Sequence, residues 1–557
     1  MSMKTTSKNR RSPRRLVASR FLEALESRTL FSGNVLASVS NGVLDLTGNN
    51  LANSIVVDQA SLTTTQLRVS SGDGSTTING KTAALIFSGV TGISVTLGCG
   101  NDTLVVQNAT VTSNVSITAS NGNQAVTLNN DMIGGNFSLT NSGGQNTTTI
   151  EDSSVTGSVT VNAGKGFNSQ CGNCWNDSRF NDANEIFTLS VATIGDNVTV
   201  SNVSGETTTD IETSLIGNNL TVTNGNASYG NCGFHSSSAS AAGDLLTLNN
   251  STVGNNVAIS NDSDGNTTNV ENSSVSGTLA VSNLVGTASQ SCFNSSCSEN
   301  LAAASDTFDL NGSSVGNNVT VSNISDGADT SIDGSSITGL LSVNNGVGSY
   351  GQCFTSCRGQ TSANFGDLLT MSASSVGSTV TITNGSTYNS TDIESSTTGS
   401  DVTVNDGLNY ATQNSNSCGN NSCSNNNCGN NQCGNNGGCG NSCGGQSQQV
   451  YTTDLFTLNS SALGNNLSVS NASGYTNTAI DSSAIAAAAT ISDENGTAYF
   501  EMSLSDIGSN LVFSAGSGYT DVDITGSMIA NNATISVNSG ATVVIAPSQV
   551  GGALVVS

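Results

Sequence analysis

The chain repeats itself with a period of 22 residues from near Val106 to its C-terminal end. The clearest stretch runs from Leu248 to Val281, where the second half repeats the first at an offset of 22. Sixteen units can be aligned on the last apolar residue of each, which we call the anchor: Ile117, Leu139, Val161, Val200, Val222, Ile259, Val281, Val321, Val343, Ile382, Val404, Val469, Ile491, Phe513, Ile535 and Val556. Most anchors are 22 residues apart, and the longer spacings contain an insertion of 15 to 43 residues just after an anchor. Such a period is typical of stacked repeats whose insertions form loops on one face.

Each unit holds three short runs in which apolar and polar residues alternate. The positions eleven and two before the anchor are apolar in all sixteen units, and the position six before is Val, Ile or Leu everywhere except at Thr398. Alternation with period two predicts short strands, and the apolar spacing of three and four that a helix needs is missing. We therefore expect an all-β fold, a parallel β-helix (solenoid) of about 16 coils, roughly 70 Å long. Stacking supplies the core, because one coil cannot bury its own apolar side.

The pattern divides the chain into three parts. Residues 1–33 are basic and are expected to be a disordered export or sorting segment. Residues 34–105 are rich in β-forming residues but out of register with the repeat, which is typical of a capping region. Residues 106–557 form the solenoid, in which 408–453 are a long inserted loop rich in Cys, Asn and Gly.

Charge limits the partners that the chain can bind. The net charge is −26, although the basic residues concentrate in the first 28 positions. Beyond them only Arg68, Lys81, Lys165, Arg179 and Arg358 are basic. Such an acidic body repels nucleic acid and anionic membranes and favours cations or neutral glycans. No apolar run is long enough for a transmembrane helix.

The N-terminal segment contains a motif-like stretch from Phe21 to Ser32, FLEALESRTLFS. It resembles the LEPR-xLL sorting motif of surface and secreted proteins in planctomycete-type bacteria, with matches at Leu25, Glu26, Arg28, Leu30 and Ser32. Ser27 stands in place of the motif's proline and Phe31 in place of a leucine. The resemblance covers about a dozen residues and implies export to the cell surface or medium, but no activity.

Cysteines other than Cys99 all fall in the insertions. In an exported protein, cysteines clustered in polar loops indicate disulfide staples, although the pairing cannot be read from the spacing. The candidates are Cys171, Cys174, Cys232, Cys292, Cys297, Cys353, Cys357, Cys418, Cys423, Cys428, Cys433, Cys439 and Cys443. An alternative is a zinc site, for which Cys171, Cys174, Cys232 and His235 would form a Cys₃His set.

No cofactor is expected, but some carboxylates could bind Ca²⁺. Asp102 lies in a stretch, GCGNDTL, that looks like one half-turn of a calcium-binding nonapeptide roll, although a plain turn fits as well. A column of acids ten before the anchor occupies alternate coils, and its best paired carboxylates are Asp210 with Glu212 and Asp392 with Glu394. The alternative for this column is a solvated face in which alternation limits repulsion.

Catalysis is not expected. A polysaccharide lyase needs a base beside clustered carboxylates, and the solenoid has only Lys165, Arg179 and Arg358, the last of them six coils from the other two. The acidic column singles out no pair for glycoside hydrolysis. We therefore expect an exported, non-catalytic structural or adhesive protein of the bacterial surface or matrix, with carbohydrate-binding or carbohydrate-active, and cation-binding, proteins as alternatives. Its partners would be envelope or matrix components, including glycans contacted by aromatic residues of the insertions: Trp175, Tyr229, Tyr350, Phe354 and Tyr410.

Overall fold

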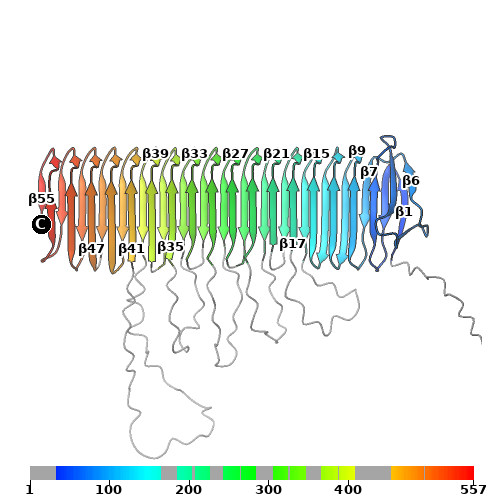
Figure 1. Cartoon of the computed structure of the whole chain (residues 1–557), viewed down its shortest axis with the longest axis horizontal. Helices are drawn as coiled ribbons and strands as arrows, with labels where there is room; N and C mark the ends of the chain where they lie inside the picture. The colour runs from blue at the N-terminus through cyan, green and yellow to red at the C-terminus, as the bar shows by residue number, and fades with distance from the viewer. Residues whose placement is uncertain are drawn as a thin grey trace, which may run out of the picture.

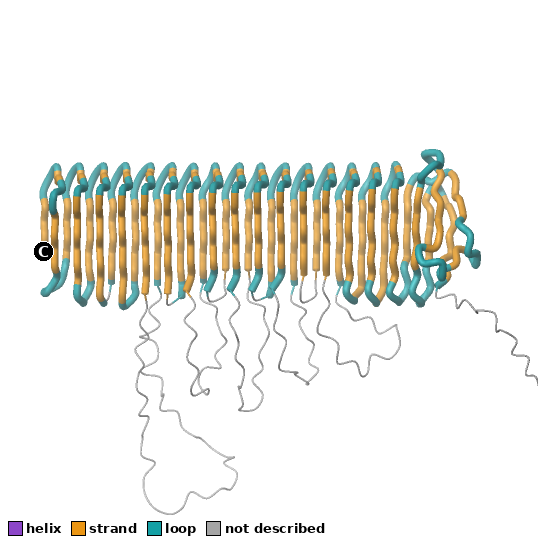
Figure 2. Tube along the Cα trace, viewed as in Figure 1, coloured by secondary structure: helices purple, strands orange, loops and turns teal. Residues whose placement is uncertain are grey.

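The fold is a straight rod of stacked β-coils, seen in a computed structural model (Figure 1). The residues that the structure describes are 33–164, 185–202, 207–225, 243–263, 265–283, 305–323, 327–346, 366–386, 388–407, 453–494 and 496–557. Within these ranges every regular element is a β-strand (Figure 2). No helix in this part of the chain could span a membrane. The expected parallel β-helix is confirmed.

One coil consists of three strands joined by two corners and a turn. In the coil that starts at Leu245, β23 (Leu245–Asn249) is followed by the two-residue β24 (Thr252–Val253) and by β25 (Val257–Asn261). Every second side chain of β23 and β25 points inward and is buried. This is the burial pattern that alternation of apolar and polar residues produces in a strand.

Equivalent strands of successive coils pair in parallel and build three long sheets. In its regular part, sheet 1 contains β8 (Asp102–Gln107), β11 (Gln124–Asn129), β14 (Asn146–Glu151), β17 (Glu185–Ser190), β20 (Thr207–Glu212), β23, β26 (Thr267–Glu271), β29 (Thr307–Asn311), β32 (Asp329–Asp333), β35 (Gly366–Ser372), β38 (Tyr388–Glu394), β41 (Thr453–Asn459), β44 (Tyr475–Asp481), β47 (Thr497–Ser503), β50 (Thr520–Thr525) and β53 (Thr542–Ile545).

Sheet 2 consists of two-residue strands, β9 (Thr110–Val111), β12 (Met132–Ile133), β15 (Ser154–Val155), β18 (Thr193–Ile194), β21 (Leu215–Ile216), β24, β27 (Ser274–Val275), β30 (Ser314–Val315), β33 (Ser336–Ile337), β36 (Ser375–Val376), β39 (Thr397–Thr398), β42 (Ala462–Leu463), β45 (Ala484–Ile485), β48 (Asp506–Ile507), β51 (Met528–Ile529) and β54 (Gln549–Val550). Sheet 3 contains β7 (Gly92–Thr96), β10 (Val115–Asn121), β13 (Phe137–Gly143), β16 (Val159–Ala163), β19 (Val198–Asn202), β22 (Leu220–Asn224), β25, β28 (Leu279–Asn283), β31 (Val319–Asn323), β34 (Leu341–Asn345), β37 (Val380–Asn384), β40 (Val402–Asp406), β43 (Leu467–Asn471), β46 (Ala489–Asp493), β49 (Leu511–Ala515), β52 (Ala533–Ser536) and β55 (Leu554–Val556).

The core is built from columns of equivalent residues. Leu248 pairs with Val270, which pairs with Leu310, which pairs with Ile332, and all four are fully buried. Burying one such side chain stabilises the fold by about 1.5–3 kcal/mol. The columns therefore supply the cohesion that a single coil lacks.

A left-handed residue turns the chain between sheets 1 and 2. The position nine before the anchor has positive φ, and it is Asn in several coils, as at Asn250 (φ 48°), but also Val191 (φ 50°) and Leu504 (φ 48°). The serine that follows it is buried: Ser251 Oγ accepts from the Ser214 amide at 3.0 Å and donates to the Asn249 carbonyl at 2.8 Å. This serine column satisfies backbone groups that the corner removes from the sheets.

The N-terminal cap differs from the coils because some of its strands run antiparallel. It contains β1 (Asn34–Ser40), β2 (Val43–Thr47), β3 (Ser54–Asp58), β4 (Gln66–Ser71), β5 (Thr77–Ile78) and β6 (Leu85–Ser88). β1 pairs antiparallel with β2, and β4 with both β3 and β6. β3 then pairs in parallel with β8, and β7 with β10. The regular coils therefore start at β7 and β8, slightly before Val106.

Candidate functional site at the loop-bearing edge

The loop-bearing edge is the corner where each sheet 3 strand ends and the next sheet 1 strand begins. The longest interruptions of the regular coils fall here: between β16 and β17, β22 and β23, β28 and β29, β34 and β35, and β40 and β41 (Figure 1). The flanking strands nevertheless stay in register with their neighbours, as in β40, where Val404 pairs with Val469. An insertion at this edge therefore leaves the stacking intact.

A ladder of buried asparagines runs along the inside of this edge, two residues after the anchors. Each side-chain Nδ2 donates to Oδ1 of the next coil at 2.7–3.0 Å. The ladder comprises Asn202, Asn224, Asn261, Asn283, Asn323, Asn345 and Asn384. Because all its donors point toward the C-terminal coils, the ladder needs an acceptor at that end.

Asp406 is that acceptor. Asn384 Nδ2 donates to Asp406 Oδ1 at 2.7 Å, while Asp406 Oδ2 has no partner among the described residues. In the next coil Asn471 Oδ1 is also buried without a partner, and Asn471 Nδ2 donates to Asp493 Oδ1 at 2.6 Å. Burial, with the nearby carboxyls of Asp454 and Asp367, raises the pKa of Asp406 to about 8. A neutral Asp406 can therefore donate from Oδ2 and continue the ladder to Asn471.

A second buried column lies beside the ladder, fifteen residues before the anchors. In the coils that follow a long insertion it holds a carboxylic acid, and these acids are Glu185, Asp244, Asp306, Asp367 and Asp454. Each is 0–4% exposed and comes directly before or at the start of a sheet 1 strand. The chain therefore re-enters the rod at a buried acid after every long insertion.

These acids bind the backbone and side chains of adjacent coils. Asp244 accepts from Thr207 Oγ1 and from Ser263 Oγ, both at 2.7 Å. Asp367 accepts from the backbone amides of Gly385 and Ser386 at 3.2 and 3.1 Å. Ser263, Gly385 and Ser386 belong to the tight turns of the next coil, which carry no long insertion. Asp244 and Asp367 therefore each tie the base of one insertion to the short turn that follows in the next crossing.

Burial alters the proton affinity of this column. It raises the pKa of Glu185 to about 8 and that of Asp367 to about 6, against the lowering effect of their hydrogen bonds. The pKa values of Asp244 and Asp454 are raised for the same reason. A carboxyl in a low-dielectric site favours the neutral form unless donors compensate. The loop-bearing edge is therefore sensitive to pH.

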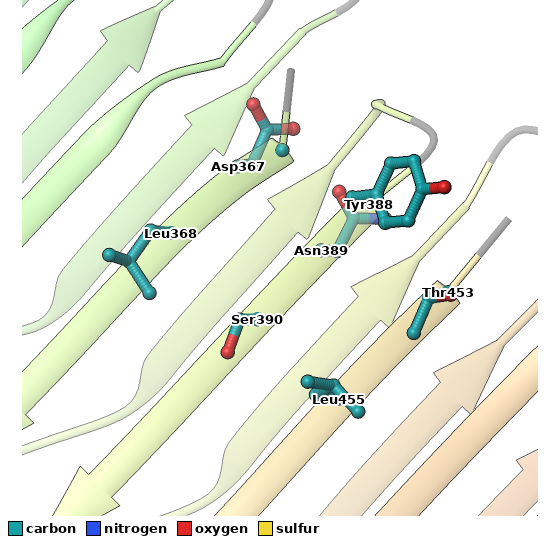
Figure 3. Close-up of a pocket in the computed structure, with 8 residues that line it drawn as sticks. Asp367, Leu368, Tyr388, Asn389, Ser390, Thr453 and Leu455 are labelled. Atoms are coloured by element: carbon teal, nitrogen blue, oxygen red, sulfur yellow. The ribbon is translucent and has the colours of Figure 1, made fainter. Parts of the chain in front are cut away.

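The outer face of sheet 1 beside the edge has a shallow depression. It lies between Leu368 and Leu455, with Ser390 in the coil between them and Tyr388 at the rim (Figure 3). Leu368 and Leu455 are 39% and 37% exposed. In four successive coils the same outward column holds Ile186, Thr208, Leu245 and Thr267, so large apolar and small polar residues alternate there.

The carboxylates proposed from sequence as cation ligands do not form ligand sets among the described residues. Asp210 and Glu212 lie on the outer face of β20, and the adjacent strands place Thr188, Thr247 and Ser190 beside them. Asp392 and Glu394 lie in the same way on β38. Burial, followed by the neighbouring glutamate, raises the pKa of each of the two aspartates. In the described part of the chain no group of three or more candidate ligands could hold a metal ion.

Asp102 is buried rather than exposed at a turn. It starts β8, and its Oδ1 accepts from the backbone amide and from Nδ2 of Asn53 at 2.7 and 3.0 Å. Desolvation raises its pKa. Asp102 thus begins the same inward column as Glu185, two coils earlier than the first long insertion, and ties the cap to the first regular coil.

The remaining candidates lie outside the described residues. These are the zinc set Cys171, Cys174, Cys232 and His235, and the other disulfide candidates of the insertions. The same holds for the N-terminal sorting segment and for the aromatic residues of the insertions. Sequence reasoning missed the buried acids, although each stands two residues before a Phe or Leu that is buried in the structure. Extending the alternation of inward and outward residues by two residues toward the N-terminus would have placed these acids on the inner face of sheet 1.

No family model, no curated protein and no solved structure matches the chain.

Proposed function

We propose that the protein is an exported, non-catalytic β-solenoid of the bacterial cell surface or matrix, and that its insertions contact envelope or matrix components. The observation that carries this proposal is the loop-bearing edge. Five long interruptions open at one corner of an otherwise regular rod, and the acids and amides at their bases keep the coils in register. Such a rod holds several segments in a row at fixed spacing.

The distribution of basic residues supports a non-catalytic role. Lys165, Arg179 and Arg358 are the basic residues beyond the cap, and all three belong to insertions. The described coils from β8 onward therefore bring no lysine or arginine beside their carboxylates. A lyase-type proton abstraction needs such a base.

Export is tested by labelling intact cells of the source organism with antibodies raised against the C-terminal coils, residues 453–557. Labelling without permeabilisation, together with disulfide-linked peptides in a non-reducing peptide map, is expected. A protein confined to the cytosolic fraction with free thiols contradicts the proposal.

The role of the insertions is tested by replacing residues 408–452 with the short turn that follows Asn471. The rod is expected to fold unchanged, while retention in the cell envelope falls. The matched control is a glycine- and serine-rich segment of the same length, which keeps the spacing but removes the side chains. Equal retention of all three proteins contradicts a contact role for this insertion.

A further inference from the structure

A row of three tyrosines lies along the outer side of sheet 1 in the C-terminal coils, and its middle member, Tyr499, is partly buried. The ring centroids of Tyr475 and Tyr499 are 5.4 Å apart, and those of Tyr499 and Tyr519 are 6.3 Å apart. Tyr475 and Tyr519 are 37% and 48% exposed. The three residues come from successive coils, but Tyr499 stands two positions further along its strand than the residue that pairs with Tyr475, so the rings step along the rod in a zigzag. Contiguous apolar surface that stays open to solvent marks an interaction site.

The surroundings of this row are acidic and polar. Tyr499 pairs with Asn477 on one side and with Asp521 on the other, and Glu501 and Asp523 pair one step further along the strands. No lysine or arginine occurs after Arg358. The face therefore combines aromatic rings with hydrogen-bond acceptors and repels anions.

The row lies beside three short crossings from sheet 3 to sheet 1, although Tyr475 pairs with Thr453, where the chain returns from the longest insertion. β43 ends at Asn471 and β44 begins at Tyr475, so the chain crosses from sheet 3 to sheet 1 within a short turn. The next two crossings, from β46 to β47 and from β49 to β50, are also short. The tyrosines thus occupy coils without a long insertion.

We propose that Tyr475, Tyr499 and Tyr519 form a binding site for a neutral glycan chain lying along the rod. The apolar C–H face of a sugar ring packs on an aromatic ring, while its hydroxyls donate to carboxylates and side-chain amides. Asn477, Glu501 and Asp521 provide those acceptors beside the rings. A uronic acid polymer would place its carboxylates against Glu501, Asp521 and Asp523, so the site selects an uncharged chain.

The tilt of the rings decides which form of glycan fits. The planes of Tyr475 and Tyr499 are inclined by 41°, and those of Tyr499 and Tyr519 by 57°. A crystalline polysaccharide presents a flat surface, which needs coplanar rings. Inclined rings instead follow a single chain that turns from one sugar to the next. The site is therefore one for soluble chains, and it is independent of the insertions proposed to contact the envelope.

The experiment is titration of the full-length protein with cello-, chito- and manno-oligosaccharides, using oligogalacturonate as the charged counterpart. At least one neutral oligosaccharide is expected to bind, and oligogalacturonate is not. Tyr499→Ala should weaken binding about tenfold, which corresponds to about 1.4 kcal/mol. Tyr499→Phe should retain most of the affinity, because the ring rather than the hydroxyl makes the contact. The control is Leu245→Ala, which removes an outward side chain that is 38% exposed from a distant coil of the same sheet.

Several results would overturn the proposal. These are preference for oligogalacturonate, unchanged affinity in Tyr499→Ala, equal loss in Leu245→Ala, and absence of binding to every neutral oligosaccharide. Competition of the bound sugar by a proline-rich peptide with higher affinity would assign the row to a protein partner instead. Thermal melting of each variant shows whether the rod stays folded, and these outward substitutions are expected to leave it intact.

Discussion

At Asp406 the atom at the position of Oδ2, an oxygen in the acid or a nitrogen in an asparagine, decides whether the buried ladder of hydrogen bonds continues to Asn471. An amide nitrogen at the position of Oδ2 would donate to Asn471 Oδ1, whereas a carboxylate presents a second acceptor to that oxygen. Asp406→Asn is therefore expected to stabilise the rod by about 2 kcal/mol at pH 9, because it removes one unpaired buried oxygen, Asp406 Oδ2, and gives a donor to another, Asn471 Oδ1. At pH 5 the gain should be small, since the protonated acid already donates. Urea unfolding at the two pH values checks this. The control is Asp506→Asn, an exposed acid on β48, and an equal gain at both pH values would contradict the assignment.

The same proton affinity predicts the pH dependence of the wild-type protein. The folded-state pKa values of Glu185 and Asp406 are raised to about 8, and that of Asp367 to about 6, above the values near 4 of an unfolded chain. The folded state therefore binds protons more tightly, and its free energy of unfolding falls as pH rises from about 4 to about 8. Above that range these groups are ionised in both states. Melting temperature measured from pH 4 to 9 at constant ionic strength should decrease, and a flat or rising profile would rule out neutral acids at the edge.

Val191 adopts an energetically unfavourable backbone conformation at the corner between sheets 1 and 2. It adopts a φ of 50°, where the Cβ of an L-residue is crowded, and its side chain is 53% exposed, so little packing compensates. Val191→Asn is expected to stabilise the fold by about 1 kcal/mol. The converse change, Asn250→Val at an equivalent corner, should destabilise it by a similar amount. Urea midpoints measure both, and a loss of stability in Val191→Asn would show that the valine makes an uncounted contact.

At the scale of strands, the sequence predicts the position of a residue only where that residue type has its usual burial and backbone conformation. The stacked Val, Leu and Ile columns were predictable because burial of such residues enforces one register. The buried acids were not, since charged residues are expected outside unless paired. The left-handed corner was hidden for a related reason: Val191 and Leu504 carry none of the usual Gly or Asn signal. The tyrosine row was missed because its members stand in different strands and come together only once the coils stack.

In the core, large and small inward side chains pack against one another on neighbouring strands. Phe308 on β29 lies between Thr268 on β26 and Thr330 on β32, and all three are fully buried. The large ring thus occupies the space that the two small side chains leave. Phe308→Ala is expected to cost about 3–5 kcal/mol, because a cavity remains. Phe308→Leu should cost much less, since Leu246 and Leu369 occupy the equivalent place in other coils. Thermal melting compares the two, and equal losses would contradict complementary packing.

At the scale of the whole molecule, each coil contacts mainly its neighbours, so stability should grow by repetition. Removal of residues 137–158 deletes one complete period, because Phe137 pairs with Val159 and takes its place in the column. We expect this deletion to fold with the same circular dichroism per residue as the wild type. Removal of only residues 137–147 shifts the inward columns and should prevent folding of the adjacent coils. Protease resistance of the two proteins distinguishes them, and equal sensitivity would show that the coils are not interchangeable.

The clamps at the base of each insertion also bear on how such a protein diversifies. Asn384 and Asp406 hold the chain where it leaves sheet 3, and Asp367 and Asp454 hold it where it returns. These hydrogen bonds join described residues of the coils to one another, so we expect foreign segments grafted between them to leave the stem folded. The insertions would then diverge in sequence during evolution while the coils that carry them stay unchanged.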